Sequence, residues 1–222
     1  MTHVKERKNS NNLRDERNSH ILMKALDWLY GKAAHGSQWF KSAKEIAEEC
    51  LAGEGTMDEK VDRFIRRQVF KSGACGFITG LGGLPTLPIT LPTNFASVTF
   101  IHLQTGIVIA CMYGYHPEND IVRTFVYVCL CGESAFTGLK KIWLTVGKKL
   151  PMKLLKKIPA RIIIAINKKV GFRLLTKFGT KGAVNLHKAV PFVGGIIGGA
   201  IDASSTRLVG KIAKKIFGSS RK

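Results

Sequence analysis

Acidic residues are almost absent from the last third of this chain. From Lys140 to Lys222 there are 20 Lys and Arg residues and a single acid, Asp202, whereas residues 1–139 carry 15 basic and 14 acidic residues. The formal charge of +20 therefore arises almost entirely in this basic third. Such an asymmetry predicts an anionic partner, which could be a membrane surface, a nucleic acid or an acidic protein.

Paired cysteines and a secretory signal are missing as well. The five cysteines are odd in number, form no C-x-x-C pair and lie mostly in apolar runs, which predicts reduced thiols in a reducing compartment. The first 20 residues are polar and charged, so no secretory signal peptide is expected and the cytosolic side is the default. Residues 1–18 have almost no apolar side chains, which predicts a disordered tail before a domain at 19–218.

Catalytic signatures are absent too. The GLGG at Gly80–Gly83 is not followed by the GK[ST] of a phosphate-binding loop, and the histidines show no metal-ligand spacing. We interpret His102, in an apolar segment, as a buried and hydrogen-bonded histidine, and Glu133 as a solvated or paired carboxylate at a helix start. The prediction is a non-enzymatic protein without metal or cofactor. An enzyme of unrecognised type is the weaker alternative.

Apolar residues recur at helical spacing through most of the chain, and no strand pattern occurs. A first helix is expected from Ser19 to a stop at Gly31, and a third begins at Thr56 with the capping-box pair Thr56 and Glu59. Its apolar stripe is expected to include Val61, Phe64, Ile65, Val69 and Phe70. The other expected helices are Ser37–Ala52, Phe95–Tyr115, Asn119–Cys131, Glu133–Val146, interrupted segments over Leu150–Phe178, and Phe192–Phe217.

Residues 72–117 contain no charged side chain. Their first half, Gly73–Pro92, is rich in Gly and Pro, and its prolines exclude a regular helix interior. Phe95–Tyr115 is long enough to cross a bilayer but carries several polar residues, so a bundle-core or re-entrant segment within 73–115 is favoured over a span. If it does span, Arg66, Arg67 and Lys71 place its start in the cytosol.

Glycines of the last helix form two rows at four-residue spacing, Gly194 with Gly198 and Gly195 with Gly199. Stacked small residues let a second helix approach closely, either in a helical bundle or in a membrane, and both interpretations stay open. Asp202 follows in the same helix. We expect its carboxylate to be partly buried and paired with a cation. Arg173 is the first candidate partner, with Lys177 and Arg207 as alternatives.

Basic residues in the last third alternate with long aliphatic ones, which is typical of helices lying on anionic lipid. Nucleic acid binding is the alternative, although stacking aromatics are sparse and no zinc finger, RRM or KH signature occurs. The candidate lipid contacts are Lys148, Lys149, Lys153, Lys156, Lys157, Arg161, Lys168 and Lys169.

The segments GFITGLGGLPTLPITLP (Gly76–Pro92), YGY (Tyr113–Tyr115) and IxxxINKKVGFRLLTKFGTKGAVNLHKAVPFVGGIIGGAIDASSTRLVGKIAKKIF (Ile162–Phe217) together resemble the EcsC family over roughly residues 20–218. The matching positions with an expected structural role are Gly80, Gly82, Gly83, Pro85, Pro88, Arg173, Gly194, Gly195 and Asp202. Others are Asn167, Gly171, Phe172, Thr176, Lys177, Gly182, Asn185, Pro191, Thr206 and Gly210.

The resemblance implies a helical fold and carries over no activity, cofactor or catalytic residue. The family is named for a bacterial protein encoded beside an ABC transporter, so an accessory role in transport or secretion, with a membrane protein or transporter as partner, is an expectation. We therefore predict a single all-α, compact multi-helix domain that is peripheral at the inner face of a membrane, with anionic lipid as its partner.

Overall fold

The computed structural model describes residues 20–81 apart from 22 and 39, then 93–132, residue 164 and 191–218. Within these ranges the chain forms helices and short connections, with one isolated bridge between Ser37 and Phe40 and no strand. This confirms the all-α domain. A helix at 20–35 is followed by α2 (Ala43–Ala52), α3 (Met57–Leu81), α4 (Thr93–Met112), α5 (Asp120–Cys131) and α10 (Pro191–Gly218).

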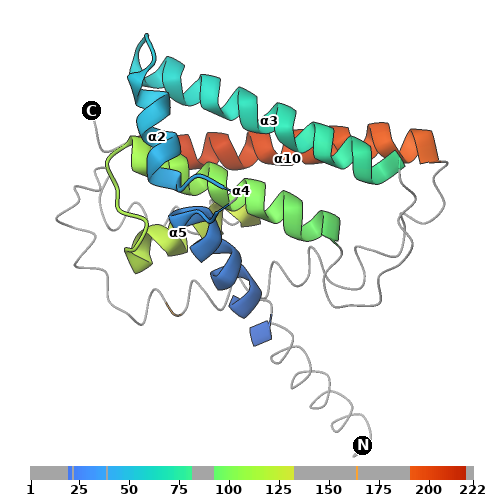
Figure 1. The fold of residues 1–222 in the computed structure, drawn as a ribbon, viewed down its shortest axis with the longest axis horizontal. Helices are drawn as coiled ribbons and strands as arrows, with labels where there is room; N and C mark the ends of the chain where they lie inside the picture. Colours follow the sequence, from blue (N-terminus) through green and yellow to red (C-terminus); the bar gives the residue numbers. More distant parts are fainter. Residues whose placement is uncertain are drawn as a thin grey trace, which may run out of the picture.

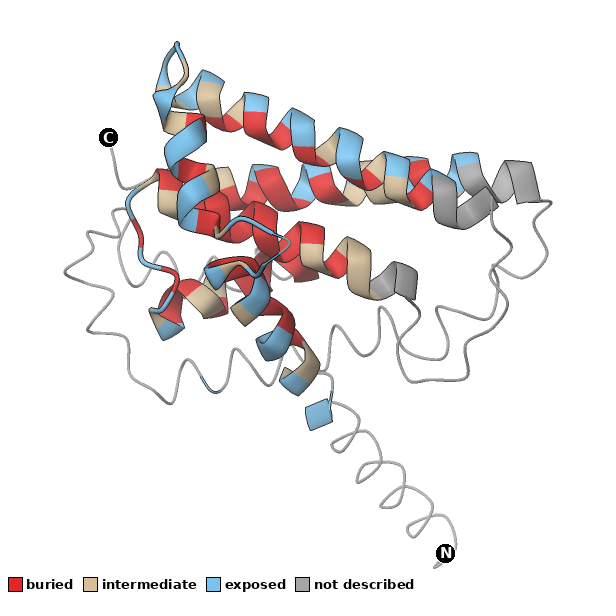
Figure 2. Ribbon diagram, viewed as in Figure 1, coloured by how far each residue is buried: buried red, intermediate tan, exposed pale blue. Residues whose placement is uncertain are grey.

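The helices are arranged around α4, as Figure 1 shows. The two longest, α3 and α10, lie side by side and run in opposite directions, and α4 contacts α2, α3, α5 and α10. Every residue of α4 from 101 to 110 is buried, including the polar His102, Gln104 and Thr105 (Figure 2). The predicted Phe95–Tyr115 helix is therefore confirmed, with an earlier start and end, as the centre of a helical bundle. No helix in the described ranges combines enough length and enough apolar character to cross a bilayer.

Capping boxes fix where α2 and α3 begin. The Thr56 N–H donates to Glu59 Oε2 at 2.7 Å and the Glu59 N–H donates to Thr56 Oγ1 at 3.3 Å, as the sequence predicts. Ser42 and Glu45 make the same pair of bonds, at 2.7 and 3.2 Å. The predicted start of the second helix at Ser37 is therefore wrong, because Ser42 caps a helix that begins at Ala43.

Two other predicted boundaries need correction. The first helix continues past Gly31 to His35, and Gly36 ends it with a φ of 75°, which favours glycine. The third helix, α3, runs through Gly73 and Gly76 to Leu81, so the first nine residues of the Gly- and Pro-rich stretch Gly73–Pro92 are helical. The prolines at 85–92 lie outside the described residues, as do the expected helices at Glu133–Val146 and Leu150–Phe178 and the tail at 1–18.

The ends of α5 and α10 agree with the sequence. Asn119 caps α5 by accepting the Ile121 N–H at 2.9 Å, and Gly132 ends it with a φ of 81°. The last helix extends from Pro191 to Gly218, one residue beyond the prediction at each end. These boundaries were predictable because each has a local chemical signal, an Asx cap, a glycine or a first-turn proline.

All five cysteines are free thiols, and each is wholly or partly buried. Cys50, Cys129 and Cys131 are buried, and Cys75 and Cys111 are half-buried. Burial raises the pKa of the Cys111 thiol to about 11. The prediction of unpaired cysteines is confirmed.

Two phenylalanines of α3 make a matched test of the fold. Phe64 is 2% exposed in the core and Phe70, which the sequence assigned to the same stripe, is 80% exposed. We expect Phe64→Ala to lower the free energy of unfolding by about 3–5 kcal/mol because it leaves a cavity. Phe70→Ala should change it by less than about 0.5 kcal/mol. Denaturant unfolding of both variants measures this, and equal losses would contradict the placement of α3.

Candidate functional site

Small residues bring the backbones of α3 and α10 into contact. A Cβ atom added at Gly199 would lie 2.9 Å from the Gly73 carbonyl oxygen, and one added at Gly198 would lie 3.2 Å from that of Gly76. A Cβ at Gly76 would lie 3.0 Å from the Gly198 carbonyl oxygen. We call this contact the glycine seam, comprising Gly73, Gly76, Gly198 and Gly199. It supports the packing role predicted for Gly198 and Gly199, here between helices of one bundle.

The register of the two antiparallel helices follows from contacts further along. Gly210 of α10 packs against Ile65 of α3, where an added Cβ would lie 2.8 Å from Ile65 Cγ1. Beyond it, Lys214 Nζ lies 2.8 Å from Asp62 Oδ1 and 3.2 Å from Asp58 Oδ1. Asp58 and Asp62, at the end of the helix pair away from the glycine seam, are therefore paired with Lys214.

Asp202 lies in the glycine seam. Its Oδ2 points at Gly76, where an added Cβ would collide with it, and this oxygen is buried without a hydrogen-bond partner among the described residues. Burial raises the pKa of the Asp202 carboxyl to about 6. Of the candidate partners, Arg207 makes no described ion pair with it, while Arg173 and Lys177 lie outside the described residues. The pairing with Arg173 stays a prediction.

A small polar cluster ties α3, α4 and α10 together beside Asp202. His102 Nε2 lies 3.1 Å from Thr206 Oγ1 and 3.2 Å from Ser205 Oγ. The backbone carbonyl of Asp202 accepts the hydroxyl protons of Ser205 at 2.9 Å and of Ser72 at 3.1 Å. These bonds satisfy a buried histidine, as the sequence predicts. The single Ser205 hydroxyl proton has two acceptors within reach, the Asp202 carbonyl and His102 Nε2, and the histidine tautomer decides between them.

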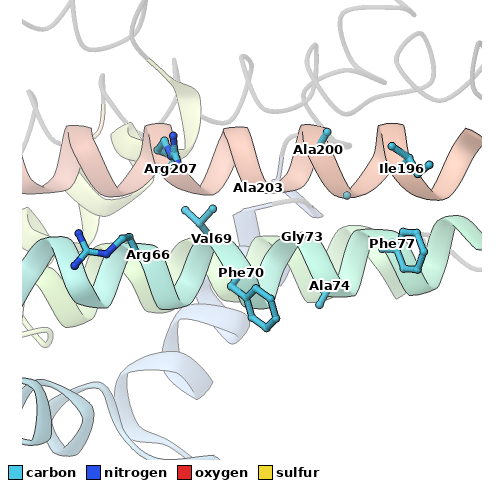
Figure 3. Close-up of a pocket in the computed structure, with 11 residues that line it drawn as sticks. Arg66, Val69, Phe70, Gly73, Ala74, Phe77, Ile196, Ala200, Ala203 and Arg207 are labelled. Atoms are coloured by element: carbon cyan, nitrogen blue, oxygen red, sulfur yellow. The ribbon is translucent and has the colours of Figure 1, made fainter.

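An open groove of about 560 Å³ follows the outer side of the glycine seam, and Figure 3 shows its two walls, one from each helix. Several of its side chains are large, apolar and exposed, including Phe70 and Ile196. Its lining residues are Arg66, Val69, Phe70, Gly73, Ala74, Phe77, Ile196, Gly199, Ala200, Ala203 and Arg207.

The groove differs in character at its two ends. Arg66 and Arg207 stand together at one end, and Phe77 and Ile196 stand together at the other (Figure 3). No acid lines the groove, and neither arginine forms an ion pair with a described acid. The arrangement places two guanidinium groups, neither paired with an acid of the described ranges, at one end of a groove with an exposed apolar surface.

The residues predicted as sites are only partly brought together. Gly198, Gly199 and Asp202 meet in the glycine seam, Gly80 lies in the last turn of α3, and Gly194 and Gly195 lie in the first turns of α10. Gly82, Gly83, Pro85, Pro88 and Arg173 lie outside the described residues. The same is true of all eight lipid-contact candidates and of Glu133.

Sequence reasoning named several of the lining residues in other roles but did not predict that they form a groove. Arg66, Phe70 and Phe77 lie at a spacing of four and seven, which places them on one side of α3. That side differs from the stripe of Val61, Phe64 and Ile65 in the core. A second apolar stripe on a helix that already has one was the available signal. Within the described residues, no group of three or more His, Cys, Asp or Glu residues could hold a metal ion.

These features define the class of protein as an all-helical domain held together by a glycine seam between two long antiparallel helices. The family model described as the EcsC protein family matches residues 5–219, nearly the whole chain. The chain therefore belongs to the EcsC family, as its motifs predicted. No curated protein and no solved structure matches it.

Because the two helix backbones touch in the seam, substitutions at the neighbouring Gly199 and Ala200 should have very different effects on the free energy of unfolding. Gly199→Leu should lower the free energy of unfolding by about 1–3 kcal/mol or more, because the added side chain meets the α3 backbone. Ala200→Leu adds atoms to the exposed neighbour, which faces the open groove, and should change it by less than about 0.5 kcal/mol. Thermal or denaturant unfolding compares the two variants. An unaltered Gly199→Leu protein would contradict the seam.

Asp202 predicts a pH dependence of stability. Its folded-state pKa of about 6 lies above the usual 3.8, so protonation favours the folded state. Stability should fall as pH rises from about 4 to about 6 and stay level above. The full shift corresponds to about 3 kcal/mol, which solvent screening of the exposed half reduces to about 1–2 kcal/mol.

Asp202→Asn should therefore stabilise the protein by about 1–2 kcal/mol at neutral pH and leave it unchanged below about pH 4. Unfolding curves at several pH values measure both effects. A loss of stability at neutral pH would contradict this expectation and would support an ion pair with Arg173 instead.

Proposed function

We propose that this EcsC family protein is a non-enzymatic, membrane-associated protein that docks on an anionic bilayer surface. The observation that carries the proposal is the charge distribution, with 20 basic residues and one acid from residue 140 onward. Each basic residue near an anionic surface contributes about 1 kcal/mol. Several such contacts acting together would hold the protein at a bilayer.

The described helices support the proposal with unneutralised cations. Arg66 and Lys71 on α3 and Arg207 and Lys211 on α10 are exposed, and none is paired with a described acid. The same two helices expose the aliphatic Ile196 and Ile201 as well as the aromatic Phe70 and Phe77. Cations on helices that also expose aliphatic side chains suit a lipid interface.

The location follows from the same chemistry. Anionic lipids of the cytosolic leaflet attract basic segments, so the inner face of a membrane is the proposed location. The candidate contacts from Lys148 to Lys169 would lie against the headgroups. A transporter or another membrane protein remains the proposed protein partner, on the basis of the family name alone.

Co-sedimentation of the full chain with vesicles tests the proposal. We expect binding to vesicles of phosphatidylcholine with phosphatidylglycerol and at least about tenfold weaker binding to phosphatidylcholine alone, since two engaged cations already contribute about 2 kcal/mol. Added salt should weaken the binding because it screens exposed charges. Filter retention of duplex DNA and single-stranded RNA at matched salt is the comparison. Equal binding to neutral vesicles, or tighter binding to nucleic acid, would refute the proposal.

A further inference from the structure

Three described helices bring uncharged ends to the same side of the bundle. In Figure 1 the C-terminal end of α3 and the N-terminal ends of α4 and α10 lie toward one side. No charged residue occurs from Ser72 to Pro117 or from Ala189 to Ile201. We call the part formed by residues 72–81, 93–101 and 191–201 the uncharged end. The opposite end of α3 and α10 carries Asp58, Asp62 and Lys214.

The uncharged end also exposes large apolar side chains to its surroundings. Ile196, Ile197 and Ile201 of α10 are 62%, 46% and 54% exposed, and Phe77 of α3 is 39% exposed. Clustered apolar side chains of this size mark an interaction surface. The exposed surface of a helical bundle in water usually includes charged residues, since Lys, Arg, Glu and Asp are mostly exposed.

Charged residues begin at matching depths on the two helices that form the groove. On α3 the first one before the uncharged end is Lys71, ten residues before Leu81, and on α10 the first is Asp202, eleven residues after Pro191. At 1.5 Å per residue these spacings are about 15 and 17 Å. One leaflet of the hydrocarbon core is about 15 Å thick, half of the whole.

We propose that the uncharged end inserts into one leaflet of a bilayer, with Lys71 at the edge of the hydrocarbon core and Arg66 and Arg207, each more than one helical turn further from the inserted end, at the level of the lipid headgroups. The inference rests on the proposed membrane docking and identifies the part that enters the lipid. The groove has the same order from charged to apolar. Its arginines lie away from the uncharged end, and Phe77 and Ile196 lie at the tip of the bundle, within the uncharged end. Arginine forms bidentate bonds with phosphate, and the apolar tip matches acyl chains.

A second copy of the chain fits this surface less well. The groove contains two arginines and no acid, so a copy seated on the same surface would place cations against cations. An acidic peptide would match the arginines but not the apolar tip. A lipid molecule has both the phosphate and the chains.

The test adds a positive charge at the tip, because insertion and simple electrostatic attraction predict opposite changes in vesicle binding. Ile196→Lys adds one positive charge at the tip, and Ile21→Lys adds the same charge at a residue of similar exposure, 55%, on the helix at 20–35. If the tip inserts, Ile196→Lys should weaken binding of the full chain to phosphatidylglycerol-containing vesicles by about tenfold or more, since a cation is costly among acyl chains. Ile21→Lys should bind equally or up to about fivefold more tightly.

Circular dichroism melts of both variants, expected to match the wild type, establish that each is folded. Ile196→Asn is a second tip variant without added charge and should also weaken binding. If wild type binds these vesicles but Ile196→Lys binds as tightly as Ile21→Lys, insertion is overturned while docking stands. If wild type does not bind, the proposed function itself fails. If wild type is a dimer without lipid and Ile196→Lys is a monomer, the tip is a self-association surface and the inference is overturned.

Discussion

The packing of α3 against α10 depends on backbones that touch without side chains between them. Glycine costs a helix about 0.5–1 kcal/mol per residue relative to alanine, so the four glycines of the seam together cost roughly 2–4 kcal/mol. Close approach returns part of this through dispersion between the two backbones and through Cα–H···O contacts of about 0.5–1 kcal/mol each. The same approach leaves no room for a Cβ atom at Gly199, and the larger side chains that flank the seam form the walls of the groove.

The placement of charge along the helix pair follows from this geometry. Asp58 and Asp62 lie where α3 and α10 can pair them with Lys214, and a single half-buried acid, Asp202, occurs inside the seam. Burying a carboxylate beside a glycine backbone has a cost that pairing does not offset among the described residues. Tight packing at Gly76 therefore places the Asp202 carboxyl group, with a pKa of about 6, against the α3 backbone. The stability of the seam depends on the protonation of this group, whereas that of an all-apolar seam would not depend on pH.

Helix ends that carry a local chemical signal could be predicted from the sequence. Features that depend on contact with a segment far away in the sequence could not. Thr56, Asn119, Gly132 and Pro191 mark helix ends through their own chemistry, so these boundaries were close. The extension of α3 through Gly73 and Gly76 could not be predicted, because glycine weakens an isolated helix and only contact with α10 makes it favourable. Phe70 was assigned to the core for a similar reason: helical spacing shows that two faces are apolar but not which face meets a neighbour. The rows of Gly198 and Gly199 were recognised as a packing surface, but their partner on α3 was not.

The residues joined by the glycine seam are far apart along the chain. Gly73 contacts Gly199 and Ile65 contacts Gly210, so more than a hundred residues of chain separate the two helices of the seam. The seam therefore forms late in folding. Loop-closure entropy makes such contacts slow to form. During synthesis, α3 leaves the ribosome well before α10 exists, with its small-residue face uncovered. Nascent chains that have not yet reached α10 are therefore the state most exposed to aggregation or to early capture by a bilayer.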